Sequence, residues 1–281
     1  MSTPRPEIAC FMYHEVTDAP RSSGFQRPAA RGYTLGREAF DRHLAGIAAG
    51  PLTPALVTRL DLSRPGRHLL LTFDDGGKSA LHAAEALARH GWLGHFFIVT
   101  QRIGERTFVS ADDIRAIRSA GHVVGSHSHS HPDIFPDLSP GRMEEEWRVS
   151  ARILEDVMGE PCVAASVPGG DISQAVLDSA ARTGFRFLFT SEPRLRPELV
   201  GGCWVLGRFC LKAGISPGRV RDLMAFRGWS RASIGRQIKV LARWGIGPLY
   251  RAYVRRATRP HLMGTAPAAT AALADDGVDG P

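Results

Sequence analysis

Short apolar runs alternate with amphipathic segments along most of the chain. The apolar runs predict buried strands near 8–13, 68–73, 94–100, 122–127, 163–167, 185–190 and 203–210. Segments with a helical spacing of apolar residues lie between them, near 37–49, 79–90, 111–120, 140–158 and 172–183. Strands that alternate with helices favour a parallel sheet covered by helices, so the pattern predicts an α/β fold.

Three local signals indicate where helices begin and end. Ser110 precedes two acidic residues, which is typical of a capped helix with an acidic first turn. Pro140 suits the first position of the longest helical segment, and Gly159 suits the left-handed residue that would end it. These signals predict helices that start near 111 and 140.

Two polar segments follow strand-like runs and could carry chemistry. Residues 70–76 read Leu-Leu-Thr-Phe-Asp-Asp-Gly, so Asp74 and Asp75 stand at the end of an apolar run. His127 and His131 follow another such run. One carboxylate with two imidazoles is a ligand set for a first-row divalent metal that activates water. A metal also accounts for adjacent carboxylates, because one can be a ligand while the other acts as a base.

Each segment alone has a simpler interpretation. Asp-Asp-Gly is a common turn sequence, and histidines in a His-rich stretch are often surface or core residues. The order of the two segments, each directly after a strand-like run, favours the metal site.

The same residues resemble the motifs of a known family. Residues 72–76 (Thr-Phe-Asp-Asp-Gly) and 127–131 (His-Ser-His-Ser-His) are similar to the first two motifs of the polysaccharide deacetylase family, also called the NodB-homology or carbohydrate esterase type. The resemblance covers about residues 8–210. It implies a distorted (β/α) barrel, often seven-stranded, with the site at the C-terminal ends of the strands.

The resemblance also implies roles for individual residues. Asp74 would be the catalytic base, and Asp75, His127 and His131 would hold the metal. Ser128 would support the loop between the two histidines. Zinc suits this ligand set, and cobalt, nickel and iron are also compatible with it.

The third family motif, Arg-x-Pro-x-Gly, has its best match in residues 166–170, Ser-Val-Pro-Gly-Gly. Pro168 and Gly170 match and are expected to shape the loop, but Ser166 stands where an arginine normally supports the base. The backbone N–H of Gly169 is a candidate donor to the oxyanion. A plain strand-to-helix turn is the alternative interpretation of this segment.

The general acid is expected from the start of the chain. The family usually has a late Leu/Ile-His motif, but the strand-like residues 203–211 contain no histidine, and His261 is poorly placed. Tyr13-His14 ends the first apolar run and resembles the Tyr-His that opens many family members. His14 is therefore the candidate acid for the leaving amine, and a structural histidine at the barrel rim is the alternative.

The family resemblance implies a hydrolase that removes acetyl groups from N-acetylated sugars, using metal-activated water and an aspartate base. Two alternatives remain. Ser166 and the missing late histidine are compatible with a glycan-binding or scaffold protein that has lost turnover. An amide or ester hydrolase for another small substrate would also use this site.

Composition agrees with one enzyme domain and a C-terminal extension. The chain has 281 residues and 43% hydrophobic content, which suits one catalytic barrel over residues 1–210. The net charge of +7 is unevenly distributed, because residues 208–259 hold thirteen basic residues and one acidic residue, Asp222. We expect a basic amphipathic helical extension over 211–260 and a disordered tail over 261–281.

Three roles suit the basic and aromatic extension. Its helices could pack on the barrel, or they could contact an anionic inner membrane face where a lipid-linked sugar would lie. Nucleic-acid binding ranks last, because no recognised module is present, and no nucleic-acid partner is expected.

The sequence shows no secretory leader and no long apolar segment. Its four cysteines have no metal-ligand spacing and suit a reducing compartment; they are Cys10, Cys162, Cys203 and Cys210. We therefore expect a cytoplasmic protein, with peripheral contact at the inner membrane face. Its substrate would be an N-acetylated glycan or lipid-linked sugar in surface or exopolysaccharide biosynthesis.

Overall fold

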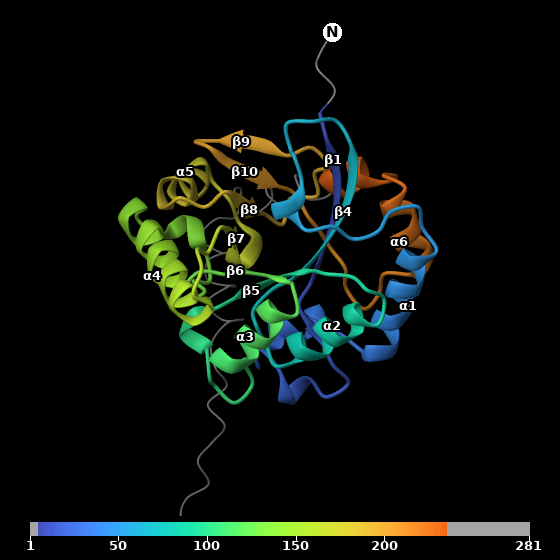
Figure 1. Cartoon of the computed structure of the whole chain (residues 1–281), viewed down its shortest axis with the longest axis horizontal. Helices are drawn as coiled ribbons and strands as arrows, with labels where there is room; N and C mark the ends of the chain where they lie inside the picture. Colours follow the sequence, from blue (N-terminus) through green and yellow to red (C-terminus); the bar gives the residue numbers. More distant parts are fainter. Residues whose placement is uncertain (1–4, 235–281) are drawn as a thin grey trace, which may run out of the picture.

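A computed structural model describes residues 5–234, and the centre of that part is a curled sheet (Figure 1). Nine strands lie in the order β11-β1-β4-β5-β6-β7-β8-β10-β9, and each neighbouring pair is parallel except β10 with β9. The strands of this sheet are β1 (Glu7–Tyr13), β4 (Arg67–Phe73), β5 (His95–Ile98), β6 (Val123–Ser126), β7 (Ala164–Ser166), β8 (Phe187–Phe189), β9 (Glu198–Val200), β10 (Cys203–Leu206) and β11 (Phe209–Cys210). A separate parallel pair is formed by β2 (Glu15–Val16) and β3 (Thr34–Leu35).

Helices surround the curled sheet on its outside (Figure 1). They are α1 (Arg37–Ala48), α2 (Ser79–Ala88), α3 (Ala111–Ser119), α4 (Pro140–Met158), α5 (Gln174–Thr183) and α6 (Pro217–Met224). In the view of Figure 1, α2 and α3 cover the lower edge, α4 and α5 the left, and α1 and α6 the right. The predicted α/β fold is therefore confirmed, as a sheet curled into part of a barrel.

The local signals in the sequence act as expected. Ser110 caps α3 by accepting a hydrogen bond from the Asp113 N–H, and the Asp113 side chain returns one to the Ser110 N–H. Gly159 ends α4 in the left-handed conformation, with φ of 71°. The residues of β1 and β4 are buried on both faces over most of their length, which explains why these strands are continuously apolar.

The predicted single strand over residues 203–210 is wrong. This stretch forms β10, beside β8, and then β11, beside β1, so it links the two sides of the curled sheet. Gly207 lies at the crossing, where an added Cβ would be 2.4 Å from the Glu192 carbonyl oxygen and 2.6 Å from that of Arg194. A side chain does not fit there, so this position between the two strands requires glycine. The hydrophobic pattern could not show this break because both strands are apolar in sequence.

The segment after β11 packs against the barrel. Val220 and Leu223 of α6 are fully buried, and the Trp229 ring stacks on Phe11 of β1 with centroids 6.4 Å apart. The remainder of the predicted extension (235–260) and the whole predicted tail (261–281) lie outside the described residues.

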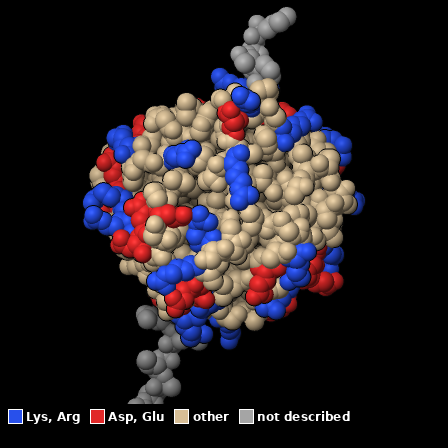
Figure 2. Space-filling model, in the orientation of Figure 1, with Lys and Arg blue, Asp and Glu red and all other residues tan. Residues whose placement is uncertain are grey.

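Charge is mixed on the face seen in Figure 2, where basic and acidic side chains are interspersed toward the edge. In the part of the chain that the structure describes, no helix is both long enough and apolar enough to cross a bilayer.

Candidate metal and catalytic site

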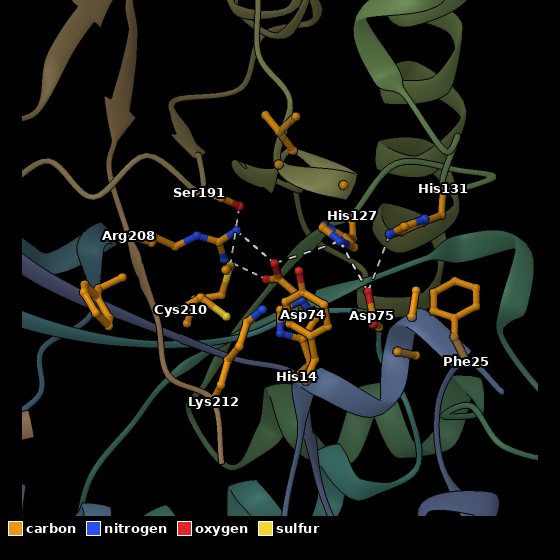
Figure 3. A pocket seen from close by; sticks show the side chains of 18 of the residues that line it. His14, Phe25, Asp74, Asp75, His127, His131, Ser191, Arg208, Cys210 and Lys212 are labelled. Carbon is orange, nitrogen blue, oxygen red and sulfur yellow. Dashed lines mark hydrogen bonds and ion pairs between the residues drawn. The ribbon is translucent and has the colours of Figure 1, made fainter. Parts of the chain in front are cut away.

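Polar side chains collect at the C-terminal ends of the parallel strands, in a pocket of about 690 Å³. His14 follows β1, Asp74 and Asp75 follow β4, and His127 follows β6. Parallel strands present these ends at one edge of the sheet, so residues more than a hundred positions apart meet there. Figure 3 shows Asp75 between His127 and His131, and Asp74 between Arg208 and His127.

Three of the predicted ligands converge on one point. Ligand atoms of Asp75, His127 and His131 all lie within 4.8 Å of one another. The Nε2 atoms of His127 and His131 are 3.4 and 3.7 Å from the same oxygen, Oδ1 of Asp75. One carboxylate oxygen and two imidazole nitrogens thus face a common position, as a divalent cation requires.

The protonation of the two imidazoles fits a metal. His127 Nδ1 lies 3.0 Å from the Ser166 carbonyl oxygen, so it carries the proton and leaves the Nε2 lone pair toward Asp75. Burial lowers the pKa of His131 to about 4, which keeps its ring neutral. Burial also lowers the pKa of His127, but the carboxylates of Asp74 and Asp75 outweigh it and raise that pKa overall. Without an ion the site attracts a proton, and a bound cation would replace that proton.

The backbone of the ligand loops is unusual. Asp75, Ser128 and His131 have φ values of 76°, 64° and 55°, a left-handed conformation that non-glycine residues adopt at a cost. Ser128 is fully buried, and its Oγ accepts a hydrogen bond of 3.1 Å from the His131 N–H. Ser128, which follows His127 in the chain, therefore also fixes the backbone of His131. His129 lies elsewhere, with Nδ1 3.0 Å from the Thr100 hydroxyl.

Asp74 is held by an arginine that sequence reasoning missed. Nη1 and Nη2 of Arg208 donate to the two Asp74 carboxylate oxygens at 2.7 and 2.8 Å. Other N–H groups of Arg208 donate to the Thr72 hydroxyl, the Thr190 carbonyl and the Ser166 hydroxyl. The guanidinium is fully buried, and this fork geometry makes a strong, directional pair.

Arg208 supports Asp74 in place of the arginine that is missing at position 166. Position 166 lacks the family's arginine, but its hydroxyl accepts from Arg208 at 2.9 Å and lies 3.2 Å from Asp74. The supporting guanidinium therefore reaches Asp74 from the link between β10 and β11. A charged residue inside an otherwise apolar strand-like run was the available signal in the sequence. Burial raises the pKa of Asp74, but Arg208 and His127 lower it further, so the carboxylate is ionised.

His14 lies in the same pocket and is not one of the three convergent ligands. Its ring is 4.6 Å from that of Tyr33, centroid to centroid, and Figure 3 shows it beside Asp74. Burial lowers the pKa of His14, although Asp75 and Asp74 act in the opposite direction.

The segment from Pro168 to Gly170 forms another part of the wall. Gly169 and Gly170 line the pocket, and Pro168 is buried behind them. Gly169 has φ of 68°, and an added Cβ would be 3.2 Å from the Asp133 carbonyl oxygen. The tight turn thus brings the backbone of Gly169 close to the site.

Another buried carboxyl, that of Glu15, supports the loop that follows Asp75. It accepts hydrogen bonds from the hydroxyls of Ser23 and Ser79. An added Cβ at Gly24 or at Gly77 would lie only 2.2 Å from Glu15 Oε1. Burial raises the pKa of Glu15 to about 7.

Known proteins resemble this chain in sequence and in fold. The model of the family described as polysaccharide deacetylase matches residues 61–188. YxkH of Bacillus subtilis, which is named for that family, is 22% identical over 201 residues, covering 69% of this chain and 68% of YxkH.

Solved structures give the same result at the level of fold. A polysaccharide deacetylase from Bacillus cereus is 18% identical with a TM-score of 0.67, over 78% of this chain and 69% of that chain. IcaB from Ammonifex degensii is 21% identical with a TM-score of 0.63, over 80% of this chain and 99% of that chain. The segment 61–188, which contains the aspartates and histidines of the site, belongs to the polysaccharide deacetylase family. This family comprises carbohydrate deacetylases that generally use a divalent metal ion.

Proposed function

We propose that this protein is a metal-dependent deacetylase that removes acetyl groups from N-acetylated sugars. The observation that carries the proposal is one pocket in which Asp75, His127 and His131 converge beside the ionised Asp74. A binding or scaffold protein would need the three ligands but not a second carboxylate held by a buried arginine. Arg208 also removes one of the two reasons for expecting impaired turnover, the missing arginine at position 166.

The three convergent residues would hold the cation. Their neutral imidazoles and single carboxylate suit zinc, and cobalt, nickel or iron are compatible with the same donors. When bound, such an ion supplies Lewis acidity, which polarises an acetamide carbonyl and makes water a stronger acid.

The remaining chemistry belongs to side chains of the chain itself. Asp74, kept ionised by Arg208, accepts a proton from the attacking water. The Gly169 N–H is our candidate donor to the oxyanion that forms on the former carbonyl. His14, which lines the same pocket, is our candidate for the acid that protonates the leaving nitrogen. The products are acetate and a free amine on the sugar.

We further propose that the reaction occurs on a glycan or lipid-linked sugar during surface or exopolysaccharide biosynthesis. The basic composition of residues 211–260 supports a cytoplasmic site of action at an anionic membrane face. Flotation of the full chain with vesicles of anionic or neutral lipid tests this location. Equal binding to both vesicles would contradict it.

Acetate release tests the proposed activity. Metal-stripped protein would be given zinc or cobalt and then N-acetylhexosamine oligomers, with O-acetyl sugars as a second panel. We expect metal-dependent release from the first panel and its loss in Asp74→Asn, with metal binding retained. Release from O-acetyl sugars alone would indicate an esterase, and metal binding without any release would contradict the deacetylase.

A further inference from the structure

The charged residues that line the pocket are almost fully paired. Arg208 pairs with Asp74, and Arg27 pairs with Asp133 at 2.7 Å. Asp75 is the proposed metal ligand. Lys212 is the remaining charged side chain of the lining, and no carboxylate lies within ion-pair distance of it among residues 5–234. One ammonium group therefore faces the pocket without a counter-charge from the described chain.

Lys212 is positioned beside the reacting groups. It follows β11 and is exposed, and in Figure 3 its side chain extends toward Asp74 and His14. Its Nζ lies 4.0 Å from the centroid of the Tyr33 ring, and the same ring lies 4.6 Å from His14. The cation–π contact with Tyr33 orients the ammonium. Tyr33 thus contacts both Lys212 and His14, the candidate general acid.

The described lining holds three basic and three acidic side chains, and a divalent ion would therefore make the pocket net positive. Asp75 is a single negative charge, so an ion of charge two leaves the ligand position net positive, and Lys212 adds another positive charge to the same pocket. A pocket with such a balance of charge attracts anions. Arg27 is a weaker candidate for binding an anion, because its guanidinium already donates a hydrogen bond to Asp133.

We propose that Lys212 binds an acidic group, a carboxylate or a phosphate, on the sugar unit next to the N-acetylated one. The preferred substrate is then an acidic glycan and not a neutral N-acetylhexosamine polymer. This inference rests on the proposed deacetylase function. An exposed ammonium suits the role, because it is a point charge that meets an anionic oxygen without the strict planar geometry of arginine.

Binding of products tests the subsite without turnover. Zinc-loaded protein would be titrated by calorimetry with de-N-acetylated oligosaccharides of equal length, one neutral and one with alternating uronate units. We expect the uronate form to bind more tightly and Lys212→Gln to weaken it about tenfold, the loss of one charge-assisted contact. Lys212→Arg should keep most of the preference. Added salt should reduce the preference, since the ammonium is exposed.

Kinetics identify the source of the acidic group. The ratio of kcat/KM for a uronate-containing over a neutral N-acetylated oligomer would be compared in wild type and Lys212→Gln. The same ratio would be measured for an N-acetylated oligomer with a phosphate on the neighbouring unit over its unphosphorylated form. A fall in the first ratio indicates a carboxylate, and a fall in the second indicates a phosphate. Arg148→Gln is the matched control, because Arg148 is an exposed cation of α4 outside the pocket lining.

Two results would overturn the subsite. These are equal affinity of wild type for neutral and acidic products, or the same weakening of both by Lys212→Gln. A failure of the proposed function gives a different result, because no acetate would be released from any sugar although the acidic product still binds selectively.

Discussion

Arg208 is the residue that orients Asp74 and keeps its carboxylate ionised. It is fully buried, and its N–H groups donate to residues at the end of β4 or just after it, to Ser166, and to the backbone after β8. Removal of the whole side chain would leave Asp74 buried without its partner, which destabilises a fold by about 3–5 kcal/mol. A substitution that keeps the charge isolates the effect of geometry.

Arg208→Lys should therefore lower kcat by about 100-fold with little change in metal affinity. Lysine keeps one positive charge near Asp74 but cannot donate two parallel hydrogen bonds to its oxygens. Steady-state acetate release and a zinc titration of the apoprotein would measure the two effects, with Arg148→Lys as control. Full activity of Arg208→Lys would show that the fork geometry is unnecessary.

His14 is tested independently of the metal ligands. His14→Ala should reduce kcat by about 100- to 10,000-fold, the usual contribution of a positioned general acid. Zinc affinity should not change, because His14 is outside the group formed by Asp75, His127 and His131. Acetate release and zinc titration are again the measurements. Unchanged turnover would leave His14 as a structural residue of the pocket rim.

At the scale of elements, the link from β10 to β11 positions the site. Gly207 passes between the Glu192 and Arg194 backbones at distances that exclude a side chain, and the next residue is Arg208. The link thus joins the two sides of the sheet. It also brings the Arg208 side chain to the C-terminal end of β4.

Gly207→Ala should destabilise the fold by about 1–3 kcal/mol, the range for overpacking a filled space. It should also reduce turnover, because Arg208 must move with its backbone. Urea unfolding and acetate release would measure both effects. Gly214→Ala is the matched control, since no heavy atom lies within 4 Å of its added Cβ. Equal stability of the two variants would contradict the packing argument.

At the scale of the whole molecule, Glu15 makes stability depend on pH. Its folded pKa of about 7 exceeds its ordinary 4.5, because burial disfavours the charged form. Its stabilising contribution is complete below pH 4.5 and is lost as pH rises through 7. The loss approaches about 3 kcal/mol at pH 8.

Glu15→Gln resembles the protonated form and should remove this loss. In urea unfolding of the metal-free protein at pH 5 and pH 8, we expect the variant to lose less stability than wild type between the two values. Glu38→Gln, at an exposed position of α1, serves as the control. The same pH dependence in Glu15→Gln and wild type would show that Glu15 does not titrate in this range.

The sequence by itself determined what local pattern controls. Continuous apolar runs predicted strands such as β1 and β4 because residues buried on both faces must be apolar. Ser110 and Gly159 predicted helix ends because capping depends on neighbouring residues only. The carboxylates and histidines were found because each follows a strand, and the family motifs occur at those positions.

Only the tertiary structure decided which distant residues meet. Arg208 and Asp74 are 134 positions apart in the chain, and no local signal links them. The same is true of Glu15 with Ser79, and of Lys212 with Tyr33. The break at Gly207 depends on backbone atoms of Glu192 and Arg194 that close around it. Side-chain pairing of this kind is set by the curl of the sheet, which brings its two sides together, and not by the residues adjacent in the chain.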